Sequence, residues 1–122
     1  AQQDSTDNSQ LLKKALKKKF IENLGLDKES ADKFFRLYNE SRKEINELTK
    51  KQKEIIEYIN DNYDDPDISL KIDEMIENEG KIFERRKNFI NSLKEFLTPQ
   101  QIAKSIVMQQ KLRKMLTGKT KE

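Results

Sequence analysis

Residues 60–67 read NDNYDDPD, the strongest turn signal inside the chain. Asn and Asp side chains readily hydrogen-bond to nearby backbone, and Pro66 disfavours helical geometry at Asp65. On both sides of this stretch, apolar residues recur at helical spacing over long segments. A short connection between two long helices makes them antiparallel neighbours. The stretch therefore predicts a long antiparallel helical hairpin.

The segment before the turn predicts one long helix. It has neither Pro nor Gly between Gly25 and Pro66, and Asp27 is a suitable N-cap. Its apolar residues follow alternating steps of four and three, with Ser41 and Gln52 filling the gaps, which is typical of a heptad-like seam. The seam consists of Phe34, Tyr38, Ile45, Leu48, Ile55 and Ile59. A helix of about 35 residues would be on the order of 50 Å long.

The segment after the turn predicts a third helix over 68–96. Its apolar residues form a stripe along one face, in which Glu79 and Arg86 are polar gaps. The stripe consists of Ile68, Ile72, Met75, Ile76, Ile82, Phe83, Phe89, Ile90, Leu93, Phe96 and Leu97. The two long helices can therefore pack against each other through apolar faces.

Two shorter helices are expected beside this pair. The first covers 10–24 and ends at Gly25, and the fourth runs from Thr98 to Gly118. Residues 1–8 are predicted to be a disordered N-terminal tail and 119–122 a C-terminal tail. The sequence thus predicts an all-α fold of four helices in a single domain over 9–118.

The composition excludes most catalytic classes. The chain has 122 residues, of which 39% are charged and 34% hydrophobic, and it contains neither Cys nor His. Their absence removes disulfides, thiol nucleophiles, the commonest general base and the commonest metal ligand. Gly-rich phosphate loops are absent as well. We therefore expect a protein that is not an enzyme and needs no cofactor.

The charge is small overall but unevenly distributed. The net charge is +3, too low to indicate nucleic-acid binding. Residues 13–19 contain five Lys, whereas 57–79 contain nine acidic residues against Lys71 alone. No apolar run approaches the length of a membrane span. The AQQDST start is typical of a mature N-terminus after signal-peptide removal, so export is expected.

Residues 97–101, LTPQQ, have the pattern of a helix start. Thr98 is a good N-cap, Pro99 suits the first helical position, and Gln101 can reach back to the Thr98 amide. Leu97, just before the cap, can contact Ile102 as a hydrophobic staple. These features alone explain the stretch as the beginning of the fourth helix.

A similar stretch occurs near the N-terminus. FIENLGLDKESA at 20–31 and FINSLKEFLTPQQIA at 89–103 both have Phe-Ile-x-x-Leu followed by Leu and a capping residue. In the first copy these positions are Leu26 and Asp27, with Ser30 at the third helical position. Each copy places a helix end and a helix start at the same end of the predicted hairpin.

A Leu-Thr-x-x-Gln motif that occurs twice around a long helical hairpin resembles the periplasmic Spy/CpxP family. Residues 97–101 match the motif, and 26–30 look like a degenerate copy that keeps Leu and a capping residue. The resemblance implies a periplasmic, all-helical, cradle-shaped homodimer. It also implies an ATP-independent chaperone or a regulator of envelope-stress signalling. The His-rich metal-binding segments of some relatives have no counterpart here.

The two long helices carry more apolar residues than one hairpin contact can bury. Most of this surplus can pack against the two shorter helices. The rest predicts a dimer interface or an apolar groove that holds unfolded or regulatory proteins, bordered by basic residues. The candidate apolar residues are Phe35, Ile56, Met75, Phe83 and Phe89. The candidate basic residues are Arg42, Lys43, Lys50, Lys53, Arg85 and Arg86.

Three functions compete at this point. The first is a holdase chaperone or stress regulator that uses this amphipathic surface. The second is a helical adaptor that docks one specific partner, such as a sensor domain. The third is a carboxylate-based metal sensor or buffer at the acidic tip, although an EF-hand loop fails because position 12 is Lys71 or Ile76 in the two possible registers. A solvated acidic tip is the simpler interpretation of 60–67.

Overall fold

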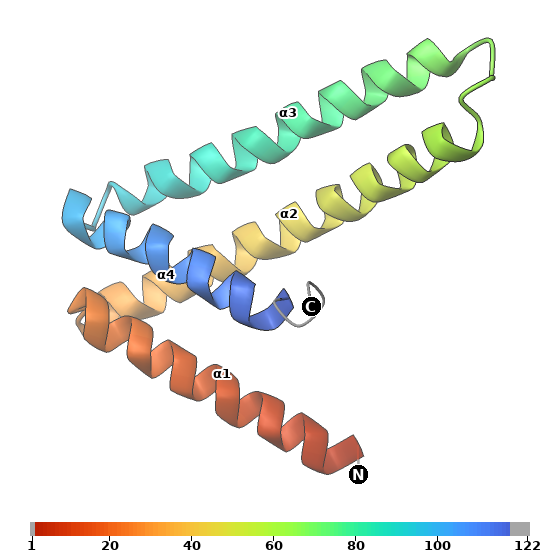
Figure 1. Ribbon diagram of the computed structural model, residues 1–122. Helices are drawn as coiled ribbons and strands as arrows, with labels where there is room; N and C mark the ends of the chain where they lie inside the picture. The colour runs from red at the N-terminus through yellow and green to blue at the C-terminus, as the bar shows by residue number, and fades with distance from the viewer. Residues whose placement is uncertain (1, 118–122) are drawn as a thin grey trace. The chain divides into compact units, whose positions relative to one another are not determined.

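The computed structural model describes residues 2–117, which form four α-helices and no strand. The helices are α1 (Gln2–Leu24), α2 (Lys28–Asp61), α3 (Ile68–Leu93) and α4 (Pro99–Thr117), as Figure 1 shows. The predicted all-α fold class is therefore confirmed. Gly118 and the predicted tail at 119–122 lie outside the described residues.

The ends of two helices differ from the prediction. α1 begins at Gln2, so residues 2–8 are helical instead of a disordered tail. They contain neither Gly nor Pro, and nothing in the backbone opposes extension of the helix toward the N-terminus. α3 ends at Leu93, before the predicted end at 96. There the Glu95 N–H donates to the Ser92 carbonyl at 3.3 Å, a tightened last turn that satisfies a terminal carbonyl.

Contacts within the chain form two compact units. One unit contains residues up to Lys33 together with those from Phe96 onward, which include α1 and α4. The other is Phe34–Glu95, which contains most of α2 and all of α3. The predicted domain over 9–118 is divided between them.

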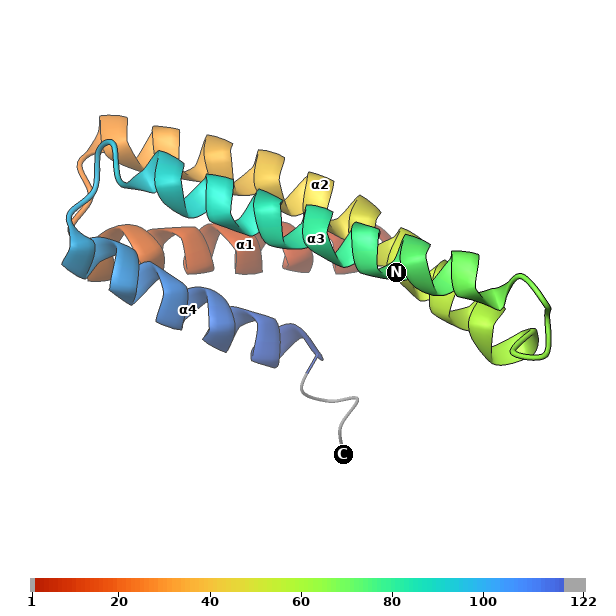
Figure 2. The ribbon, with the colours of Figure 1, turned by 90° about the horizontal axis from the view of Figure 1, so that it is seen from above.

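Within the Phe34–Glu95 unit, α2 and α3 lie side by side and antiparallel, as Figure 2 shows. Cross-helix contacts demonstrate the direction, because residue numbers rise along one helix as they fall along the other. They join Glu44 to Arg85, Leu48 to Asn78, and Gln52 to Met75. Every residue of the predicted α2 seam is buried or half-buried. The heptad spacing therefore predicted the contact face of α2 correctly.

An aromatic cluster lies where the first turns of α2 in this unit contact the last turns of α3. Phe34 is fully buried, and its ring centroid lies 6.0 Å from those of Tyr38 and Phe89. Tyr38 and Phe89 are themselves 6.2 Å apart. The Phe35 and Phe34 rings form a T-shaped pair, with their centroids 5.1 Å apart. Such ring pairs stabilise beyond the area that they bury.

The α3 face that contacts α2 differs from the predicted stripe. Ile72, Ile76 and Phe83 are exposed, whereas Asn78, outside the predicted stripe, is almost completely buried. Among the buried or half-buried positions of α3, Met75, Asn78 and Ile82 are three and four residues apart, and Phe89 follows seven residues later on the same face. The helix is turned so that a polar residue enters the interface and part of the apolar stripe faces solvent.

The predicted turn lies between Asp61 and Ile68 and is organised around Asp65. The Asp65 carboxylate accepts hydrogen bonds from the Tyr58 hydroxyl at 2.7 Å and from the Asp67 N–H at 2.9 Å. The Asp67 N–H, followed by the Tyr58 hydroxyl, lowers the pKa of Asp65. The hydrogen bond to Asp65 and its negative charge raise the pKa of Tyr58. The acidic residue thus stabilises its own turn.

Candidate binding surface and helix corners

Thr98 begins α4 through a complete capping box. Its Oγ1 accepts from the Gln101 N–H at 3.1 Å, and its own N–H donates to Gln101 Oε1 at 2.9 Å. Pro99 is the first helical residue, as predicted. Leu97 and Ile102, on either side of the cap, are both buried. The local structure predicted for residues 97–101 is confirmed.

Gln101 also makes a contact that joins the two ends of the chain. Its Nε2 donates to the Leu24 carbonyl at 2.9 Å, across 77 positions of sequence. Leu24 is the last residue of α1, where carbonyls lack intrahelical partners. Gly25 then takes φ 67°, and the Leu26 N–H donates back to the Ile21 carbonyl at 3.1 Å, which is the Schellman pattern. The motif therefore fastens α4 to the end of α1.

The second corner begins α2 with a side-chain cap from Asp27. The Ser30 N–H donates to Asp27 Oδ1 at 2.7 Å, and the Ala31 N–H donates to the Asp27 carbonyl at 2.9 Å. Leu26 and Ala31, on either side of this cap, are buried like Leu97 and Ile102. The two predicted corners are therefore both capped helix starts within one unit, although only the Thr98 corner has a reciprocal capping box.

The Asp27 cap has a pH dependence that can be measured. The backbone and side-chain hydrogen bonds from Ser30 lower its pKa. Because the folded pKa is the lower one, the cap stabilises α2 above the ordinary Asp pKa and is lost as pH falls through the lowered value. We expect NMR titration of the Asp27 carboxyl to give a pKa below that of exposed aspartates. In Ser30→Pro, which lacks the donor N–H, the pKa should return toward the ordinary value, and an unchanged pKa would contradict this assignment.

Gln101→Glu separates the two roles of Gln101. A carboxylate still accepts from the Thr98 N–H, but it cannot donate to the Leu24 carbonyl and adds negative charge at the end of α1. At neutral pH we expect unfolding free energy to fall by about 1–3 kcal/mol relative to the parent.

Acid should reverse this loss. Once protonated, the carboxyl group that Gln101→Glu introduces can donate to the Leu24 carbonyl, so its folded pKa is raised above the unfolded value. The stabilisation is therefore present at low pH and lost as pH rises through the raised pKa. Chemical denaturation of the variant and parent at each pH measures the difference. The Gln101→Ala control should show no recovery in acid, and a variant as stable as the parent at neutral pH would contradict the role of the Leu24 contact.

An exposed apolar face lies on the Phe34–Glu95 unit. Ile76 and Phe83 of α3 are seven residues apart and therefore share one helix face, together with Ile72. Phe83 is 63% exposed, although an aromatic side chain of this size normally contributes to a core. Ile56 of α2 is also exposed. We call these four residues the apolar face.

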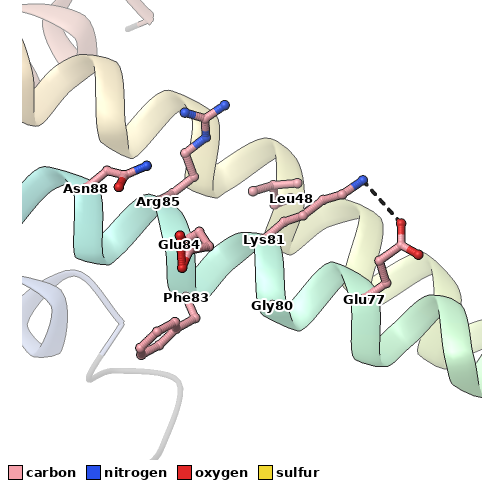
Figure 3. A pocket seen from close by; sticks show the side chains of 8 residues that line it. All are labelled: Leu48, Glu77, Gly80, Lys81, Phe83, Glu84, Arg85 and Asn88. Atoms are coloured by element: carbon pink, nitrogen blue, oxygen red, sulfur yellow. Dashed lines mark ion pairs between the residues drawn. The ribbon is translucent and has the colours of Figure 1, made fainter.

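Two open grooves of about 730 Å³ each adjoin Phe83. The first lies between α2 and α3 at Leu48, Gly80 and Asn88; Figure 3 shows its side chains. The second is lined by Ile56 and Ile82 with Gln52 and charged neighbours. Because Phe83 contributes to both grooves, its ring is the central apolar element of this surface.

The charges around the grooves are balanced. The first groove has Lys81 and Arg85 with Glu77 and Glu84, and the second has Lys53 and Arg86 with Glu57 and Glu79. Lys81 pairs with Glu77 at 3.7 Å, drawn as a dashed line in Figure 3, and Arg85 pairs with Glu44 at 3.6 Å. The rims therefore carry both signs, not the mainly basic border that the sequence suggested.

The predicted surface residues separate into four groups. The groove-lining residues, all of them exposed, are Ile56, Phe83, Lys53, Arg85 and Arg86. Arg42, Lys43 and Lys50 are exposed on α2 but line neither groove. Phe35 and Met75 are half-buried. Phe89 is buried against Phe34 and Tyr38, so its assignment to the surface was wrong; its position beside the α2 seam places it in the core.

Sequence reasoning missed Asn78 and assigned Ile72 and Ile76 to the packed stripe. A signal for Asn78 was present, since it follows Met75 by three residues and precedes Ile82 by four. The polar gap at Gln52 in the α2 seam also required a polar partner on the opposite helix. Pairing Gln52 of α2 with Asn78 of α3 would have predicted the face of α3 that contacts α2.

The described residues limit other kinds of site. Among them no helix is long and apolar enough to cross a bilayer. Nor do the described Asp and Glu side chains gather in threes around a potential metal position. Comparisons of the chain with family models, with curated proteins and with solved structures find no match.

Proposed function

We propose that this chain is a Spy/CpxP-like binding protein that holds unfolded or regulatory polypeptides on the surface of α2 and α3 without using a nucleotide. The observation that carries the proposal is the exposed Phe83 ring between two open grooves. Exposed apolar surface rimmed by polar residues is typical of protein interaction sites. A periplasmic location and a cradle-shaped homodimer built on the α2–α3 hairpin belong to the same proposal.

The surface chemistry favours polypeptide segments as ligands. Apolar side chains of a bound polypeptide can contact Phe83, Ile76 and Ile56. The groove rims contain acidic and basic residues, so they can pair with both basic and acidic side chains of the ligand. Nucleic acid requires a predominantly basic surface, which these grooves lack. Shallow contacts of this kind favour weak and reversible binding, because few side chains become fully desolvated.

Aggregation of a denatured substrate tests the proposal. A model protein is diluted from denaturant with increasing amounts of the purified chain, without ATP, and light scattering is followed. We expect scattering to fall as the chain is added. Unchanged scattering at several-fold molar excess would overturn the holdase function. A single stoichiometric partner recovered from envelope extract would instead identify an adaptor.

A further inference from the structure

Two amide side chains are buried between α2 and α3. Asn78 of α3 is 2% exposed, and Gln52 of α2 is also buried. Burying an amide among apolar side chains is unfavourable unless its hydrogen bonds are replaced. A thin core would be more stable with apolar residues at both positions. The pair therefore calls for a role other than stability.

The two amides bond reciprocally across the interface. Asn78 Nδ2 donates to the Leu48 carbonyl of α2 at 2.8 Å, and Gln52 Nε2 donates to the Met75 carbonyl of α3 at 3.1 Å. The side chains also bond to each other, from Asn78 Nδ2 to Gln52 Oε1 at 2.9 Å. Gln52 Nε2 further donates to Glu79 Oε1 at 3.1 Å. Both amides are thus held by the opposite helix.

These hydrogen bonds favour one alignment of α2 and α3 over alignments in which α3 is shifted by a turn. Sliding α3 by one turn moves it about 5.4 Å along α2. Aliphatic residues of a heptad seam can exchange partners after such a slip, because their contacts are non-directional. Asn78 and Gln52 would then be too far apart to bond and would be buried against apolar neighbours. Within the described residues Asn78 Oδ1 is already buried without a hydrogen-bond partner, so losing the remaining amide bonds would add further unsatisfied groups to the interface.

We propose that the Gln52–Asn78 pair sets the register between α2 and α3. Through that register it sets the positions of Ile56 of α2 and Phe83 of α3, which both line the second groove. A one-turn slip would change the spacing between these two side chains and so change the apolar face. The inference concerns the fold of this unit and does not depend on what the surface binds.

Cysteine cross-linking reads the register directly, because the chain contains no Cys. Glu44→Cys with Arg85→Cys reports the native register, since those side chains are 3.6 Å apart. Glu44→Cys with Lys81→Cys, and Glu47→Cys with Arg85→Cys, report slips of about one turn in the two directions. With a short thiol cross-linker in the otherwise unchanged chain, the native pair should react at least about tenfold faster than either slipped pair.

The decisive variant is Gln52→Leu with Asn78→Leu in each cysteine background. We expect the slipped pairs to react within a few-fold of the native pair, and the thermal midpoint to stay equal or rise. The Thr49→Leu control adds leucine at an exposed α2 position in the second groove. It should leave the ratio of native to slipped cross-linking rates unchanged. Asn78→Leu alone should give an intermediate ratio, which decides the matter if the double variant does not fold.

Two results would overturn the inference. One is a double variant, or a folded single variant, whose slipped pairs remain as unreactive as in the parent; the turn or the apolar packing would then set the register. The other is an equal rise in the reaction rate of the slipped pairs in the Thr49→Leu control. Slipping would then result from the added leucine and not from the lost amide bonds.

Discussion

Replacing Phe34 with Ala is expected to lower the free energy of unfolding by about 3–5 kcal/mol. Phe34 is fully buried, and its ring lies within 6.0 Å, centroid to centroid, of Tyr38 and Phe89. Removal of the ring eliminates these contacts and leaves a cavity that helices can close only in part. Since small domains are stable by about 5–15 kcal/mol, this loss should be a large fraction of the total free energy of unfolding.

Urea denaturation followed by circular dichroism measures this loss. Phe35→Ala is the matched control, because Phe35 is the adjacent residue of the same type but only half-buried. Its substitution should lower the free energy of unfolding clearly less than Phe34→Ala does. Equal losses for the two variants would show that the aromatic cluster around Phe34 is not the principal core of this unit.

Replacing Phe83 with Asp is expected to weaken binding of unfolded substrate by about tenfold or more, as for a central aromatic residue of an interface. Phe83 is 63% exposed and adjoins both grooves, so a carboxylate there removes the central apolar contact without opening a cavity. The free energy of unfolding should change little, because exposed positions contribute little to it. A loss of binding at unchanged stability would locate the binding surface.

Leu70→Asp is the matched control for Phe83→Asp. Leu70 lies on the same helix and is 65% exposed, but 13 residues of α3 separate it from Phe83, which places it about 140° away around the helix. We expect this variant to suppress aggregation like the parent. Equal loss in both variants would indicate that any exposed apolar residue suffices, and unchanged activity of Phe83→Asp would remove the grooves from the proposed function.

The sequence predicted the helix starts accurately because their determinants are local. Thr98 and Gln101 are three residues apart, and Asp27 and Ser30 have the same separation, so each cap forms from neighbouring residues. The contact face of α2 was also predictable, because its seam keeps one period over several turns. The start of α1 was not, because residues 2–8 lack a strong signal for either a helix or a tail.

The face of α3 could not be predicted from its own residues. Its apolar residues cover a wide arc, and several rotations of the helix bury a similar number of them. Asn78 decides among these rotations by bonding to Leu48 and Gln52 of α2. Apolar residues left out of the contact, including Ile76 and Phe83, then become the candidate binding surface.

By itself, the sequence determined that there are four helices, the caps at Asp27 and Thr98 and the turn at 60–67, since each depends on residues within a few positions of one another. Only the tertiary structure decided that Gln101 reaches Leu24, that Asn78 is buried and that Phe83 is exposed. Each of these depends on how one helix is rotated and placed against another. Directional hydrogen bonds between residues distant in sequence set that placement, and a helical period alone does not specify them.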